Sequence, residues 1–266
     1  MLKSLYFALV LGLAAPALAQ TDIAPAPAEA GPAATPPPAT TLPDADPALW
    51  VLRDEDTTIY LFGTFHMLDG RPWFNDEIRT AFDASSELVL EAIMPEDQGA
   101  IAALTIRSAI DPQGRTLSGR LTARENERLA AVLAEMGIPA VVFDRFEPWY
   151  VSLAITVSAI QRAGLVGAHG AENVLSAAAR ERNMPIAQLE SFEAQLAMLD
   201  GIPEDLQLVQ LRATLDELAR LPEILQPALA AWSRGDIEEM TAVMDDPTND
   251  DPRLRRIFLA DRNARW

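Results

Sequence analysis

Apolar residues first fall into short strand-like runs along the chain and then into helical stripes. In ALWVLRDEDTTIYLFG, residues 48–63, two apolar-rich runs flank an acidic turn at Asp54 to Asp56, which predicts two strands joined as a hairpin. SELVLEAI, residues 86–93, is a compact apolar run that suits a buried strand. MPIAQLE, residues 184–190, predicts one more short strand.

Helical signals dominate the rest of the chain. In LTARENERLAAVLAEMG, residues 121–137, Thr122 and Glu125 form a capping box, an apolar stripe follows, and Gly137 stops the helix. The nearly all-apolar stretch 147–164 predicts a helix that opens at Pro148. Further helices are expected at 71–85 and 171–182, and then from Phe192 onward, where breaks are predicted at Pro203, Pro222, Pro227 and the loop 245–252.

Strands that alternate with helices predict the α/β class, here a mixed sheet with flanking helices and a helical C-terminal third. The last helix, LRRIFLADRNARW, carries apolar residues at Leu254, Ile257 and Phe258. No later segment is available to cover them, so we expect this end to be exposed and mobile.

The amino end predicts export. Residues 1–19 combine Lys3, an apolar stretch and an Ala17-Leu18-Ala19 cleavage site, as in a secretory signal peptide cut after Ala19. Residues 20–44 are rich in Pro and Ala and predict a disordered linker, because they offer little apolar surface to bury. The remaining residues, 45–266, are expected to form one domain in the periplasm or outside the cell, with no membrane span after cleavage.

Composition narrows the chemistry. The chain has no cysteine, which excludes disulfides, thiolate metal ligands and a thiol nucleophile. Its formal net charge of −18 argues against nucleic acid or an anionic membrane as a partner. Histidine and carboxylates are left as metal ligands, and they suit harder divalent ions.

Three predicted strands end in side chains that can do chemistry: His66, Glu91 and Glu190. In open α/β sheets, ligands collect at the carboxyl ends of strands, so these side chains could share a metal or acid/base site with Glu172, in the first turn of a helix. Each also has a structural interpretation: a buried or loop histidine, solvent-facing or capping glutamates, and a helix-dipole partner at Glu172. His169, between two glycines, is expected to be a solvated turn residue.

The string IYLFGTFHML resembles the first Gly-x-x-His signature of the TraB/GumN family. Similar blocks follow in the family's order: AFDASSELVLEAIMPED, GLVGAHGAENVL, MPIAQLESFEAQL, AWSRGDIEEM and LADRNARW. The family is similar to Tiki-type metalloproteases and pheromone-shutdown proteins, and belongs to a wider group with EreA-like (erythromycin-esterase-like) and ChaN-like domains. Six blocks in one order make this resemblance specific.

The resemblance implies a metal-dependent hydrolase, possibly a peptidase that acts on peptides or other small substrates. It implies His66, Glu91 and Glu172 as metal ligands for Mn²⁺, Co²⁺ or Zn²⁺. It implies Glu91, Glu190, Arg262 and Asn263 as catalytic or supporting residues. The family pattern continues into a strand with a second histidine, so the resemblance also implies a truncated chain or a site that has lost this ligand. A non-catalytic periplasmic binding or accessory protein, for instance beside polysaccharide export, is the alternative.

Overall fold

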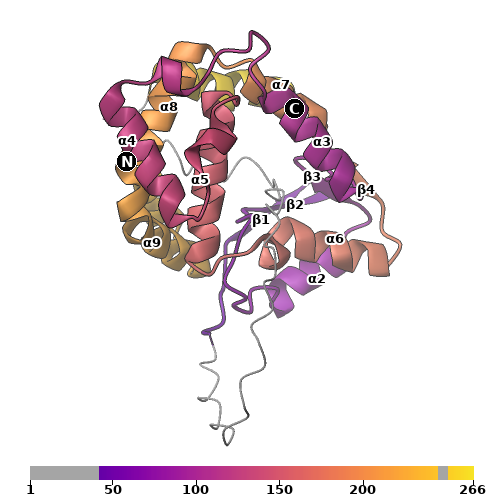
Figure 1. Ribbon diagram of the computed structural model, residues 1–266. Coiled ribbons are helices and arrows are strands. Elements are labelled where there is room, and N and C mark those ends of the chain that lie inside the picture. Colours follow the sequence, from indigo (N-terminus) through magenta and orange to yellow (C-terminus); the bar gives the residue numbers. More distant parts are fainter. Residues whose placement is uncertain (1–41, 245–250) are drawn as a thin grey trace, which may run out of the picture.

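The computed structural model describes residues 42–244 and 251–266 (Figure 1). The predicted signal peptide, most of the predicted linker and most of the loop 245–252 lie outside these residues. Strand β1 (Leu49–Arg53) pairs antiparallel with β2 (Thr58–Phe62), as expected. The acidic turn closes the hairpin because Asp54 Oδ1 accepts hydrogen bonds from the backbone N–H groups of Asp56 at 3.2 Å and Thr57 at 2.8 Å.

A second sheet leads to two of the candidate site residues, Glu91 and Glu190. Strand β3 (Leu88–Leu90) runs parallel to β4 (Ile186–Gln188), and backbone hydrogen bonds continue the pairing to Glu91 and Glu190. The two sheets are separate in the described part of the chain. The predicted α/β class is confirmed, although the strands are short and helices make up most of the molecule.

Helices lie on either side of these strands (Figure 1), and the β1–β2 hairpin is largely exposed. On one side of the molecule α5 packs against α8 and α8 against α4, whereas on the other α3 packs against α7 and α6 against β3. Short 3₁₀ turns lie at Ser118–Arg120, Ala140–Phe143, Gly167–His169 and Leu218–Arg220. The helices are α2 (Asp76–Ala84), α3 (Gln98–Ala109), α4 (Ala123–Glu135), α5 (Pro148–Arg162), α6 (Ala171–Glu181), α7 (Phe192–Asp200), α8 (Glu204–Glu217), α9 (Leu221–Ser233), α10 (Ile237–Met244), α11 (Pro252–Arg255) and α12 (Asp261–Asn263).

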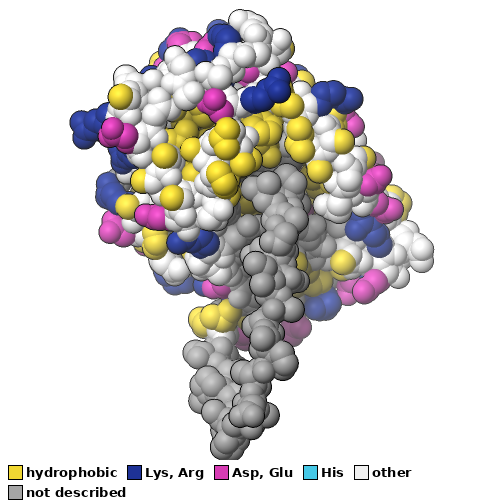
Figure 2. Space-filling model, viewed as in Figure 1, with side chains coloured by type: hydrophobic (Ala, Val, Ile, Leu, Met, Phe, Trp, Pro, Cys, Tyr) yellow, Lys and Arg dark blue, Asp and Glu magenta, His cyan; other side chains and the backbone are white. Residues whose placement is uncertain are grey.

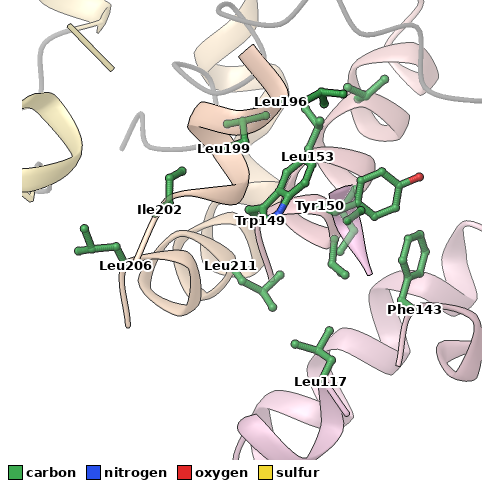
Figure 3. Packing of buried hydrophobic residues seen from close by; sticks show 14 of the residues in the cluster. Leu117, Phe143, Trp149, Tyr150, Leu153, Leu196, Leu199, Ile202, Leu206 and Leu211 are labelled. Atoms are coloured by element: carbon green, nitrogen blue, oxygen red, sulfur yellow. The ribbon is translucent and has the colours of Figure 1, made fainter. Parts of the chain in front are cut away.

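The larger hydrophobic core forms around α5. Helix α5 carries apolar residues on nearly all of its faces. It is therefore buried on nearly all sides, and Trp149 is fully inaccessible. Figure 3 shows Trp149 among Leu153, Leu199 and Leu211, which come from α5, α7 and α8. The predicted capping box is also present, since Thr122 and Glu125 exchange hydrogen bonds at the start of α4. Local capping and tertiary burial therefore favour the same helices.

A second hydrophobic core lies beside the hairpin. It joins the loop after β2 to α2, α6 and α9, and its aromatic centre includes Phe65, Trp73 and Trp232. Phe62, at the end of β2, stacks on Trp73 with ring centroids 5.5 Å apart. These contacts fix the segment that leads from β2 to His66.

Two expectations about the C-terminal third are wrong. Pro227 lies inside α9 instead of breaking it, because the helix is held on its apolar side by the second core; Pro222 lies in its first turn, as a helix start allows. Leu254 and Phe258 are not exposed: they are 4% and 5% accessible and pack into the first core. The terminal helical segment, residues 252–263, is thereby anchored to the body.

The surface mixes charges of both signs. On the face shown in Figure 2, arginine and acidic side chains surround a central gathering of apolar side chains. No helix among the described residues is long and apolar enough to cross a bilayer.

Candidate functional site

The loop after β2 places His66 inside the protein, where it is 8% exposed. Trp232 Nε1 donates a 2.8 Å hydrogen bond to the carbonyl of Gly63, at the point where the strand ends. The carbonyl of Phe65 accepts a 3.0 Å hydrogen bond from the N–H of Ala171, the first residue of α6. The loop that carries His66 is therefore fastened to α9 and to the start of α6.

Close backbone packing makes this junction possible. A Cβ atom added to Gly170 would lie 2.0 Å from the carbonyl oxygen of His66, so glycine is needed there for steric reasons. Leu68 and Val166 form an isolated antiparallel bridge just beyond. The first turn of α6 is thus held directly against the histidine.

His66 pairs with Glu172 in that first turn. Nδ1 of the imidazole lies 2.9 Å from Oε1 of the carboxylate, and the two side chains are 7% and 21% exposed. Thr64 Oγ1 donates a hydrogen bond to the same oxygen. Burial would raise the pKa of Glu172, but the charge of His66 and the hydrogen bonds from His66 and Thr64 outweigh burial and lower it. Glu172 is therefore held as a carboxylate that orients the imidazole.

Glu91 and Glu190 form a second group, with Arg262 between them. Arg262 Nη2 lies 2.9 Å from Glu91 Oε2 and 2.5 Å from Glu190 Oε1, and its Nε donates to the same Glu190 oxygen at 2.7 Å. Gln195, on α7, donates to that oxygen at 3.1 Å. The two glutamates are thus joined through one guanidinium.

Both groups lie at the carboxyl end of the β3–β4 sheet. Glu91 and Glu190 follow the two parallel strands directly. Helix α6 packs against β3 and turns within four residues into β4, so it runs back along the sheet and its first turn lies at the carboxyl end of both strands. This is the end at which α/β sheets collect ligands.

Comparison with known proteins shows the family of this chain. The model of the TraB/PrgY/gumN family matches residues 48–266. The chain belongs to the TraB/PrgY/gumN family. It is similar to the uncharacterized protein YbaP of Escherichia coli, with 24% identity over 222 residues that cover 83% of this chain and 80% of that protein.

Two further proteins to which this chain is similar are also called uncharacterized. YbaP of Shigella flexneri is 25% identical over 155 residues, 58% of each chain. A Treponema pallidum protein is 26% identical over 188 residues, 70% of this chain and 55% of its own length. No solved structure matches. The predicted family is confirmed, whereas the predicted likeness to EreA and ChaN stays a prediction.

The last candidate, Asn263, and the second histidine, His169, are both exposed. Asn263 is exposed on the helical turn beside Arg262. His169 is exposed, as expected for a turn residue, and its imidazole lies over Gly70 while its carbonyl accepts from Trp73 Nε1 at 3.4 Å. Sequence reasoning missed Thr64 altogether, although its hydroxyl stands two residues before His66, on the same loop.

The metal ligands implied by the resemblance do not converge in this arrangement. Glu172 lies against His66, but Glu91 lies against Arg262. Among the described residues, no three side chains of His, Cys, Asp or Glu are grouped so that they could hold a metal ion. The described residues thus do not bring together the three protein ligands that a catalytic zinc site uses. The metal ion stays a prediction for a binding measurement.

Proposed function

We propose that this member of the TraB/PrgY/gumN family is an exported hydrolase in which the His66–Glu172 pair supplies the general base. The observation that carries the proposal is the 2.9 Å contact between His66 Nδ1 and Glu172 Oε1 inside a nearly buried loop. A histidine whose tautomer and orientation are set by a carboxylate is a common acid/base device in hydrolases.

The chemistry follows from the direction of the pair. With the proton of a neutral imidazole on Nδ1, the nitrogen 2.9 Å from Glu172 Oε1, the proton-accepting nitrogen is Nε2. Nε2 would take a proton from a water molecule as that water attacks a carbonyl carbon, and the negative carboxylate of Glu172 stabilises the resulting imidazolium. The imidazolium would then return this proton to the departing amine or alcohol as the C–N or C–O bond breaks. Thr64 holds the carboxylate in place through its own hydrogen bond.

Peptides and esters are the two substrate classes with a carbonyl that this base can serve. The test is hydrolysis of fluorogenic peptides and p-nitrophenyl esters by the purified protein and by His66→Ala and Glu172→Gln. We expect each change to lower kcat/KM by at least about 100-fold, the usual contribution of a positioned base. His169→Ala and Glu181→Gln are the matched controls, because they remove an exposed histidine and an exposed glutamate of α6.

Equal rates in His66→Ala and the unchanged protein, with both folded, would exclude His66 as the base. Absence of hydrolysis of both substrate classes by the unchanged protein would favour the alternative of a binding or accessory protein. Melting temperatures of all variants separate a loss of chemistry from a loss of fold.

A further inference from the structure

The guanidinium of Arg262 lies beside Glu91, the carboxylate that the resemblance implies as a metal ligand. Arg262 is 3% exposed and contacts both Glu91, at 2.9 Å, and Glu190, at 2.5 Å. Two hydrogen bonds converge on Oε1 of Glu190, one from Arg262 Nε and one from Gln195, and Arg262 Nη2 forms an ion pair with the same oxygen. This oxygen is therefore already surrounded by donors.

The helical segment that carries Arg262 fixes the guanidinium firmly. Leu254 and Phe258 bury this segment in the first core, and Phe258 precedes Arg262 by one helical turn. The wide π-turn Arg256–Ala260 leads into that last turn. The ring of Trp266 stacks against the guanidinium, with its centroid 4.5 Å from Cζ. Arg262 is therefore a built-in part of the site and not a mobile surface group.

Electrostatics opposes a second cation at this place. The guanidinium of Arg262 is a cation, so a positive charge lies between the two glutamates. The other oxygen of Glu190 is buried and has Arg265 as its neighbouring cation, with Nη2 at 3.9 Å. A divalent ion placed among these groups would meet two guanidinium groups at short range and few available oxygens.

We infer that Arg262 is the resident cation of the Glu91–Glu190 pair and takes the place of a metal ion there. Both glutamates then act as positioning residues that hold Arg262 at the carboxyl end of the sheet. The inference that no metal ion binds at these two glutamates stands by itself. The inference that hydrolysis proceeds without a metal ion rests on the proposed function.

The first experiment measures metal binding directly. The purified protein is titrated calorimetrically with MnCl₂, CoCl₂ and ZnCl₂, and its melting temperature is recorded with each salt and with EDTA. We expect no saturable binding of one equivalent and no shift of the melting temperature. One equivalent bound by the unchanged protein and lost in Glu91→Gln or Glu190→Gln would overturn the inference, whether or not any hydrolysis is found.

The second experiment removes the guanidinium. Arg262→Gln leaves two facing carboxylates without a counter-charge, so we expect a lower melting temperature that Mn²⁺ or Zn²⁺ raises again by at least about 2 °C. The added change Glu190→Gln should abolish this rescue. Arg256→Gln is the control, because it removes a charge from an exposed pair of the same helical segment. Arg262→Lys, which keeps the charge, should show no rescue, and a rescue in it equal to that of Arg262→Gln would contradict the inference.

If Arg262→Gln fails to fold, Arg262→Lys and the calorimetric titration of the unchanged protein still decide the question. Loss of hydrolysis in EDTA without metal binding at Glu91 or Glu190 would count against the proposed function and leave the inference about Arg262 standing.

Discussion

Glu172 shows how one buried carboxylate can serve both chemistry and stability. A carboxylate whose pKa is lowered on folding stabilises the native state above its ordinary pKa and loses that contribution as the pH falls. In this protein burial alone would raise the pKa of Glu172. The charge of His66 and the hydrogen bonds from His66 and Thr64 outweigh burial, so the pKa is lowered. The pair that orients the imidazole therefore also ties the loop to α6.

We predict that Glu172→Gln lowers the free energy of unfolding at pH 7 by about 2 kcal/mol, the range for a hydrogen bond to a charged group. The difference from the unchanged protein should shrink below about pH 4.3, where an unfolded glutamate is itself protonated. Urea unfolding from pH 3.5 to pH 7 measures it, with Glu181→Gln as the control for the loss of one charge. A difference that stays constant over this range would contradict the assigned cause.

At the scale of elements, the structure depends on one tight junction between the loop 63–70 and the start of α6. Gly170 and Gly167 lie on either side of the 3₁₀ turn there, and neither has a positive φ. Their surroundings differ, because a Cβ at Gly170 would lie 2.0 Å from a backbone atom, whereas at Gly167 its nearest neighbour would be 3.8 Å away. The two glycines form a matched pair for a test of the junction.

We predict that Gly170→Ala lowers the free energy of unfolding by about 3 kcal/mol, since the backbone must move apart to admit the methyl group. Gly167→Ala should change it by no more than about 0.5 kcal/mol. Chemical unfolding of both variants checks this. Equal stability of the two would mean that the loop and α6 are less tightly held than their contacts indicate.

Elements with local signals could be predicted from the sequence. The hairpin at 49–62 is set by its own turn, α4 by its capping box, and α5 by Pro148 and its apolar length. Pro227 was misjudged because tertiary packing holds α9 together around it. Local pattern carries no information about such long-range support.

The candidate site was predicted as a set of residues, but not as an arrangement. Strand ends indicated His66, Glu91 and Glu190 as candidates, and a helix start indicated Glu172. Their division into two groups depends on Arg262, which lies 72 residues beyond Glu190 and reaches it only through the packing of the terminal segment. Spacing along the chain cannot show that Arg262 contacts both glutamates. It also does not show that Thr64 donates a hydrogen bond to Glu172.

At the scale of the whole molecule, the terminal segment links stability to the site. Leu254 and Phe258 of this segment pack into the first hydrophobic core. Arg262 of the same segment contacts Glu91 and Glu190, which follow β3 and β4. Because interiors are close-packed, a cavity at Phe258 is expected to be felt both by the core and by the arginine one turn away.

We predict that Phe258→Ala lowers the free energy of unfolding by about 3–5 kcal/mol, the usual cost of removing a buried aromatic ring. The ring is 5% exposed, while Val141, at 75%, offers a control in which Val141→Ala should have an effect within about 0.5 kcal/mol. Urea unfolding measures both, and limited proteolysis followed by mass spectrometry reports on the terminal segment. In Phe258→Ala we expect new cleavage after Arg255 or Arg256 before the body of the protein unfolds, because the segment loses its anchor while the rest of the core keeps its own contacts. If Phe258→Ala left both stability and cleavage unchanged, the segment would not be anchored by the core, and the fixed position of Arg262 would need another cause.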